Sequence, residues 1–120
     1  ANKMILAERQ FVFTRYPEVI TQYKMRKNQI LADIQRYKTD LRDFPTYEEV
    51  AAGRREIDNL TRFLQEKRLT SVERDALRNQ INNTRIRCAR AEERLYAERN
   101  QRVASLQEEI RSINYLLGNY

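Results

Sequence analysis

The sequence predicts an all-α protein, either an elongated antiparallel helical hairpin or a three-helix coiled-coil bundle with a long C-terminal helix. Only two glycines and two prolines occur in 120 residues, of which 33% are charged and 41% hydrophobic. Turn residues are therefore scarce, and good helix formers dominate. The apolar residues are scattered singly at spacings of three and four, which indicates a thin helical seam rather than a thick globular core.

The length predicts a single helical coiled-coil domain over residues 1–120. We expect helices at about 3–15, 17–43, 47–68 and 71–117. Pro17 suits the first position of the second helix, where its missing N–H costs nothing. That helix continues a heptad seam with one charged member, formed by Phe13, Tyr16, Ile20, Tyr23, Lys27, Ile30, Ile34, Tyr37, Leu41 and Phe44.

The third helix is predicted from the stretch "DFPTYEEV". Pro45 disfavours helical geometry at the residue before it, and Thr46 with Glu49 has the spacing of a capping box, so a helix should start near residue 47. Its seam includes Gly53. A glycine weakens a helix by about 1 kcal/mol relative to alanine, unless a partner helix needs a close approach there.

The last helix is predicted from a second capping box, formed by Thr70 and Glu73, and from Gly118 as its C-terminal stop. No proline or glycine occurs between these signals. Its seam has two regular halves, first Leu77, Ile81, Thr84, Cys88, Ala91 and Leu95, then Val103, Leu106, Ile110, Ile113 and Leu117. Arg99 fills the eight-residue step between the halves, so we expect a stutter and a change of partner near residues 95–103.

The stretch "QINNTRIRCAR", residues 80–90, is polar but keeps this seam in frame. Thr84, Cys88 and Ala91 are small where a stable coiled coil would place leucine or isoleucine. Such residues bring two backbones close together or leave room for a bulky partner such as Tyr23, Tyr37 or Phe63. Cys88 is then most simply a small buried apolar residue, with a redox role as the less favoured alternative.

Catalysis and cofactor binding are not expected from the composition. A single cysteine cannot form an internal disulfide, and without histidine there is no zinc pattern and no Ser/His or Cys/His pair. No phosphate-binding loop or EF-hand loop is present. The chain also lacks a run of about 18 apolar residues, so we expect a soluble, intracellular, by default cytoplasmic protein without a membrane, metal, cofactor or small-molecule substrate.

The charge leaves two interpretations open. The formal net charge is +6, with 18 arginines against five lysines, which permits an anionic partner without requiring one. The candidate residues for binding a phosphate backbone are Lys24, Lys27, Arg78, Arg85, Arg87 and Arg90. The alternative is a solvated face with ordinary interhelical ion pairs.

Two functions follow from these patterns. The favoured one is a non-enzymatic interaction or assembly module, similar to a scaffold or adaptor, that forms a homo-oligomer or docks on a larger complex. Its candidate interface is the second half of the last seam, Val103, Leu106, Ile110, Ile113 and Leu117. The alternative is a basic helical protein that associates with nucleic acid or regulates it through arginine stripes.

Overall fold

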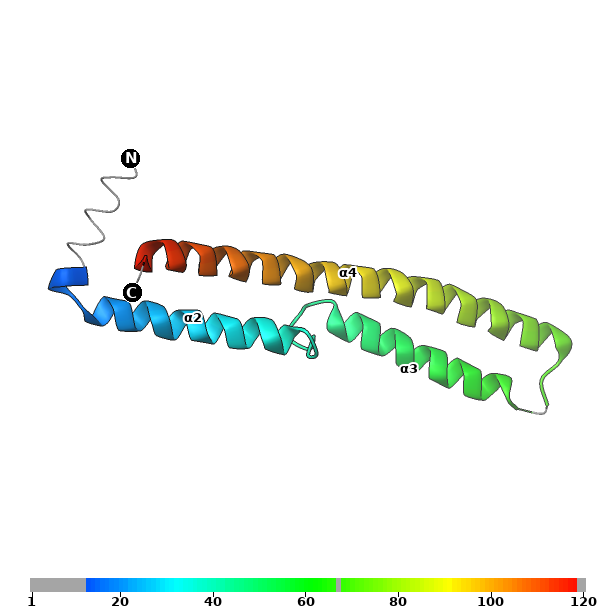
Figure 1. Cartoon of the computed structure of the whole chain (residues 1–120). Coiled ribbons are helices and arrows are strands. Elements are labelled where there is room, and N and C mark those ends of the chain that lie inside the picture. The colour runs from blue at the N-terminus through cyan, green and yellow to red at the C-terminus, as the bar shows by residue number, and fades with distance from the viewer. Residues whose placement is uncertain (1–12, 67, 119–120) are drawn as a thin grey trace. The chain divides into compact units, whose positions relative to one another are not determined.

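The computed structural model describes residues 13–66 and 68–118, and it confirms the all-α class and the long C-terminal helix (Figure 1). The helices are α2 over Glu18–Tyr37, α3 over Tyr47–Leu64 and α4 over Ser71–Leu117. These described residues include no strand. Most of the first predicted helix, at about 3–15, lies outside the described residues, and its described part, residues 13–15, is helical.

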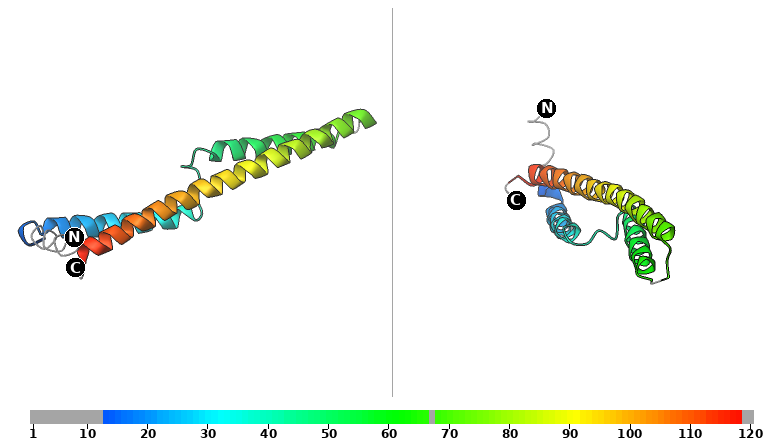
Figure 2. Two further views of the ribbon diagram at one scale, coloured as in Figure 1. Left: turned by 90° about the horizontal axis from the view of Figure 1, so that it is seen from above. Right: turned by 90° about the vertical axis from the view of Figure 1, so that its right-hand side faces the viewer.

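The chain forms two compact units, and α4 contributes to both. The α3 unit, Leu41–Asn100, pairs α3 with the first part of α4. The α2 unit, Ala1–Asp40 and Gln101–Tyr120, pairs α2 with the last part of α4 in its described residues. Figure 2 shows both pairings from two further directions. α2 and α3 therefore pair with different parts of α4.

The partner of α4 changes between Asn100 and Gln101. At the same place the seam takes three consecutive steps of four residues, from Ala91 through Leu95 and Arg99 to Val103. Such a stutter locally unwinds the supercoil, so the seam changes its direction around the helix. The predicted change of partner near residues 95–103 is therefore confirmed.

The core of the α3 unit is small. Val50 from α3 and Ala91 from α4 are each 1% exposed, and Cys88 and Leu95 are buried beside them. Four partly buried residues pack against this cluster, namely Leu41, Phe44, Tyr47 and Ile57. The first two precede α3 in the sequence, so the segment that leads into α3 helps to close its core.

The end of α2 was predicted at residue 43, and this prediction is wrong, since the helix ends at Tyr37. The carbonyl of Arg36 accepts hydrogen bonds from the N–H of Asp40 at 2.9 Å and from Thr39 Oγ1 at 3.4 Å. Threonine and aspartate are weak helix formers whose side chains compete for backbone groups. The chain turns here, so Leu41 and Phe44 leave the α2 seam and join the α3 unit.

The start of α3 at Tyr47 agrees with the prediction, but the predicted capping box between Thr46 and Glu49 is wrong. The carboxylate of Glu98 on α4 accepts both hydrogen bonds of Thr46, from its N–H at 3.2 Å and from Oγ1 at 2.9 Å. Thr46 itself has helical dihedral angles, φ −79° and ψ −8°, whereas a capping side chain usually needs the extended region. A carboxylate from another helix therefore caps α3.

The two ends of α4 agree with the predicted signals. The N–H of Glu73 donates to Thr70 Oγ1 at 3.1 Å, and the N–H of Thr70 donates to Glu73 Oε1 at 3.2 Å, which confirms the second capping box. Gly118 has a positive φ of 59° and its N–H bonds the carbonyl of Asn114 at 3.0 Å. Glycine tolerates this left-handed conformation, which ends a helix.

The end of α3 lies at Leu64 rather than at residue 68 as predicted. The guanidinium of Arg74 on α4 donates to the carbonyl of Leu64 at 2.9 Å and to that of Glu66 at 3.0 Å. Helix carbonyls at a C-terminus lack partners within the helix. Arg74 therefore satisfies the end of α3 and holds the connection to α4.

The α2 unit buries a conventional apolar seam. Ile30 is fully buried on α2, and Leu106, Ile113 and Leu117 are buried on α4. Phe13 packs edge-on against Tyr23, with ring centroids 6.3 Å apart. Arg26 on α2 makes a bidentate ion pair with Glu109 on α4, at 2.9 and 3.2 Å.

We predict that Glu109 titrates at a lower pH than an ordinary glutamate. The hydrogen bond from Arg26 lowers the pKa of Glu109, partial burial opposes this shift, and the positive charge of Arg26 adds to it. Because the folded-state pKa is lowered, the pair stabilises the fold above the unfolded-state pKa, and this contribution disappears as the pH falls through the folded-state pKa. Carboxyl ¹³C NMR titration should therefore show a raised Glu109 midpoint in Arg26→Gln.

Arg36→Gln, on the same helix, is the matched control and should leave the midpoint of Glu109 unchanged. The same midpoint in the wild type and in Arg26→Gln would contradict the ion pair.

Candidate functional site

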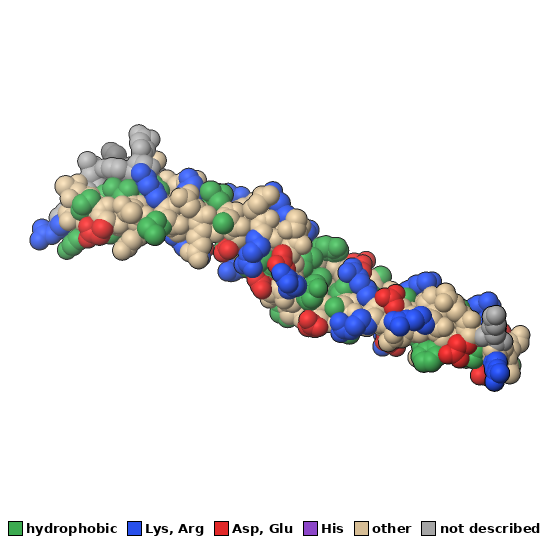
Figure 3. Space-filling view, turned by 90° about the horizontal axis from the view of Figure 1, so that it is seen from below, with side chains coloured by type: hydrophobic (Ala, Val, Ile, Leu, Met, Phe, Trp, Pro, Cys, Tyr) green, Lys and Arg blue, Asp and Glu red, His purple; other side chains and the backbone are tan. Residues whose placement is uncertain are grey.

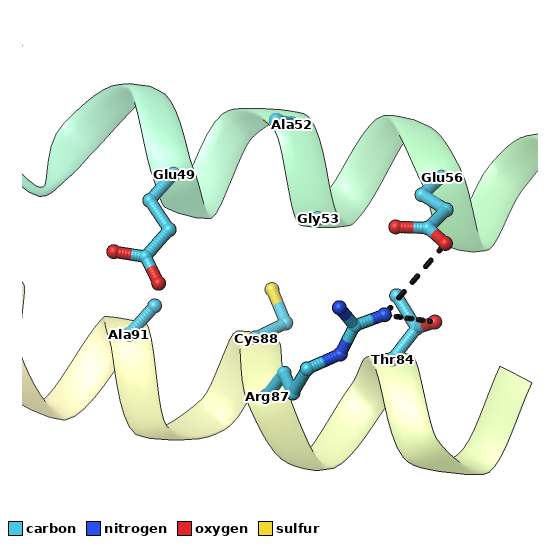
Figure 4. A pocket seen from close by; sticks show the side chains of 8 residues that line it. All are labelled: Glu49, Ala52, Gly53, Glu56, Thr84, Arg87, Cys88 and Ala91. Atoms are coloured by element: carbon cyan, nitrogen blue, oxygen red, sulfur yellow. Dashed lines mark hydrogen bonds and ion pairs between the residues drawn. The ribbon is translucent and has the colours of Figure 1, made fainter. Parts of the chain in front are cut away.

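α3 and α4 approach each other closely at Gly53 on α3 and Cys88 on α4 (Figure 4). A Cβ atom on residue 53 would lie 3.2 Å from Cys88 Sγ and 3.3 Å from Cys88 Cβ. This contact explains the glycine in the α3 seam. Ile81, Thr84, Cys88 and Ala91 are all buried, so the prediction that the polar stretch keeps the seam in frame is confirmed.

The polar atoms at this crossing have partners within the chain. Cys88 Sγ lies 3.7 Å from the carbonyl of Val50, to which its S–H donates. Thr84 is 1% exposed, and its hydroxyl donates to the carbonyl of Gln80 at 2.9 Å. Cys88 is 7% exposed and lies between the backbones of α3 and α4. It therefore packs the two helices together as a small apolar residue.

A shallow pocket of about 220 Å³ lies beside the crossing. Figure 4 shows that Glu49 and Glu56 come from α3 and that Arg87 reaches toward α3 from α4. Arg87 lies 3.7 Å from the Glu56 carboxylate, and Glu49 pairs with Arg94 at 2.5 Å. The charged groups around the pocket are thus neutralised by one another.

Ion pairs flank the seam on both sides of the α3 unit. Besides the two pairs at the pocket, Arg54 pairs with Glu92 at 2.8 Å. The hydrogen bond that Arg54 donates to Glu92 raises the pKa of the Arg54 guanidinium above its ordinary value, with partial desolvation opposing it. The side chains of these three pairs remain 35% to 68% exposed. Each pair therefore contributes about 0–1 kcal/mol, and together they favour the antiparallel register.

Mixed charge is also visible on the surface. In Figure 3, which shows one face of the molecule, many basic side chains lie next to acidic ones. This pattern is typical of a solvated surface with ion pairs, and it spreads the net charge of +6 over the surface instead of gathering it in one basic patch on this face.

The six residues predicted to bind phosphate do not lie in one unit. Lys24 and Lys27 are on α2 in the α2 unit, whereas the four arginines are on α4 in the α3 unit. Arg78 and Arg85 line one groove of about 310 Å³ together with Thr61, Leu64, Ile81 and Asn82. Arg87 lines the pocket beside Gly53 instead. Two of the six residues, Arg78 and Arg85, therefore share this groove.

The five residues predicted as a protein interface are brought together in the α2 unit. Leu106, Ile113 and Leu117 are 1% to 4% exposed, and Val103 and Ile110 are partly buried. This seam packs within the chain, in the unit that α2 forms with the end of α4. Binding of a second chain at these residues stays a prediction, and it would require α2 to be displaced.

A different surface of α4 is exposed along the α3 unit. Ile86 is 51% exposed, and it lies two residues after Thr84 and two before Cys88, which places it nearly opposite the buried seam. Residues at alternating steps of four and three continue this line along the helix. We call it the outer stripe, formed by Val72, Ala76, Asn79, Asn83, Ile86, Arg90, Glu93, Ala97 and Asn100, which are all exposed.

The outer stripe combines apolar, amide and charged residues. Two of its nine members, Arg90 and Glu93, are charged, which is close to the charged share of the whole chain. Three of its members are asparagine, a poor helix former whose side chain competes for backbone hydrogen bonds. Exposed apolar residues beside these amides, above all Ile86, give the stripe groups that a partner could cover.

The outer stripe does not stand out in the sequence when apolar residues alone are counted. A heptad search that also accepts asparagine and alanine would have found the second frame, since its spacing is regular from residue 72 to residue 100. Ile86 was the strongest local signal, because it interrupts an otherwise polar stretch out of phase with the buried seam.

Two further classes of site were sought. Among the described residues, no helix is long and apolar enough to cross a membrane. No group of three or more histidine, cysteine, aspartate or glutamate side chains is arranged to hold a metal ion in that part of the chain.

We predict that Gly53→Leu destabilises the fold, although leucine is the better helix former. The larger side chain overlaps Cys88 at the helix crossing, and overpacking of this kind costs about 1–3 kcal/mol in the free energy of unfolding. Urea denaturation followed by circular dichroism measures the change. Ala52→Leu is the matched control: Ala52 is exposed, so its substitution should change stability by less than about 0.5 kcal/mol. A Gly53→Leu chain as stable as wild type would show that the two helices are not closely packed there.

Comparison of the chain with protein-family models, with curated proteins and with solved structures finds no match.

Proposed function

We propose that the chain is a non-enzymatic helical interaction module that binds another helix through the outer stripe of α4. One observation carries the proposal: on the side of α4 that faces away from α3, Val72 and Ile86 are 78% and 51% exposed, in a line of nine exposed residues of which two are charged. The stripe extends over about 42 Å at 1.5 Å per residue. A second helix is the partner that such a spacing fits, because helices pair along stripes of this period.

The rest of the α3 unit supports this role by fixing α4 in place. α3 covers the buried seam, the Gly53 crossing sets the distance between the helices, and Arg74 and Glu98 hold the two ends of α3. A long helix without such support would lose conformational entropy on binding. A preformed stripe reduces this cost.

The interface proposed here is different from the one that the apolar seam suggested. The seam around Ile113 is buried within the α2 unit, so it supports the fold of α4. The outer stripe is the surface of α4 that is already exposed.

A nucleic-acid-associated role is the second candidate, and one observation favours it. Residues 76–91 contain four arginines and no acidic residue, and two of them, Arg78 and Arg85, line a common groove. However, Arg78 pairs with Asp75 at 3.8 Å and Arg87 with Glu56 at 3.7 Å. The positive charge that is left for a phosphate backbone is correspondingly reduced.

The interaction module can be tested by photo-crosslinking from the stripe. We expect a photoreactive amino acid at position 86 to form a covalent adduct with another polypeptide, whether that is a second copy or a different protein. The adduct should appear on gels of the purified chain at high concentration or of extract from cells that produce the chain. Position 63 is the matched control, because Phe63 is 54% exposed on α3 and lies off the stripe.

Equal adduct formation from positions 86 and 63, or none from position 86 under either condition, would contradict the proposed module.

The second candidate predicts strongly salt-dependent binding to nucleic acid. If the arginines contact phosphates, the affinity for a duplex measured by fluorescence anisotropy should fall steeply with the logarithm of salt concentration. A combined charge swap of Arg85, Arg87 and Arg90 should then flatten the slope. Under the favoured proposal we expect no binding at 0.1 M salt, and tight binding with a steep slope would instead support the second candidate.

A further inference from the structure

We infer that the helix bound by the outer stripe is the outer stripe of a second copy of this chain, running antiparallel to the first. The inference rests on the proposed function and names the partner for the same surface. It is carried by the two charged residues of the stripe and by the residues on either side of them.

Arg90 and Glu93 are adjacent on the outer stripe and have opposite charges. They lie three residues apart, so both project from the same side of α4 within one turn. Both are exposed, and neither forms an ion pair with any residue that the structure describes. The only charges on this stripe are thus free to meet a partner.

Charge complementarity decides the direction of the second copy. In a parallel pair, Arg90 would face the partner's Arg90 and Glu93 would face the partner's Glu93, and such like-charge contacts are unfavourable. In an antiparallel pair with its two-fold axis between these positions, Arg90 faces the partner's Glu93 and Glu93 faces the partner's Arg90. Because a two-fold interface repeats every contact, one complementary pair in the sequence gives two ion pairs in the dimer.

The same axis also matches the neighbouring residues. It places Ile86 opposite the partner's Ala97, a large side chain against a small one, as interdigitating helices require. One step further, Asn83 lies opposite the partner's Asn100, and their side-chain amides can donate to and accept from each other. The contact therefore has complementary charge at its centre, apolar pairs beside it and amide pairs outside.

The size of this interface predicts a reversible dimer. From Asn83 to Asn100 the contact extends over about 26 Å of helix, and it buries only two isoleucine side chains, one from each copy. The central ion pairs are solvent-exposed in part, so salt should weaken them. Association should therefore depend on both protein and salt concentration.

The test is sedimentation equilibrium of the full chain at low salt over a wide range of concentrations. The wild type should approach twice the monomer mass of 14.5 kDa. Arg90→Glu and Glu93→Arg should each weaken the dimer at least about tenfold, because each substitution creates two like-charge contacts. The double variant Arg90→Glu/Glu93→Arg should recover the dimer, since the exchanged charges again face each other.

Arg55→Glu is the matched control, because Arg55 is exposed on α3, and it should leave association unchanged. The helical circular dichroism of all variants should remain that of the wild type, since both substituted positions are exposed. A monomeric wild type, single variants that associate normally, or a double variant that does not recover would overturn the inference.

The antiparallel direction of the two copies is tested with introduced cysteines in a Cys88→Ala background. An oxidised mixture of Asn83→Cys and Asn100→Cys chains should form the mixed disulfide, whereas a parallel dimer would form the two homodimers and contradict the inference. A chain that stays monomeric but gives photo-adducts with another protein from position 86 would overturn self-association and leave the interaction module in place. If the chain neither self-associates nor forms photo-adducts from position 86, both the dimer and the interaction module are overturned.

Discussion

Burial of the seam along α4 is the constraint on which the rest of the structure depends. The helix is 47 residues long, and its seam shifts frame where Arg99 adds a third step of four residues. Such a stutter locally unwinds the supercoil. The chain supplies two shorter helices, α3 for the first frame and α2 for the second. The seam of the first frame contains small residues, and a Cβ atom at Gly53 would lie 3.2 Å from Cys88 Sγ, a tight contact.

The fold could be predicted from the sequence where neighbouring residues determine it. The Thr70–Glu73 capping box and the left-handed Gly118 determine the ends of α4 within a few residues of the chain. The predictions failed where a residue distant in the sequence determines the end of a helix. Thr46 donates a hydrogen bond to Glu98, which lies 52 residues further along the sequence. Arg74 on α4 donates to a carbonyl at the end of α3. A local capping pattern at Thr46 could not show that a carboxylate on another helix would compete for the same groups.

The surfaces were harder to predict than the fold, because their roles depend on the register between helices. Arg87 faces Glu56 only because α3 and α4 pair antiparallel around Gly53. Ile113 is apolar and regularly spaced whether its partner is α2 or a second chain, so the sequence pattern alone leaves both open. The outer stripe was missed for a different reason: asparagine and alanine do not register as a seam when apolar residues alone are counted.

Together these features describe a helix with two sides. One side of α4 is buried by the chain itself, and along the α3 unit the opposite side carries exposed residues with the spacing of a second helix contact. Self-association through the outer stripe is tested most directly by a dilution series of the ¹⁵N-labelled chain, followed by two-dimensional NMR. The account predicts concentration-dependent shifts of the amide signals of Asn83, Ile86, Arg90 and Ala97, with those of Phe63 and the outer face of α2 unchanged. Spectra that do not change with concentration, or changes confined to other surfaces, would contradict it.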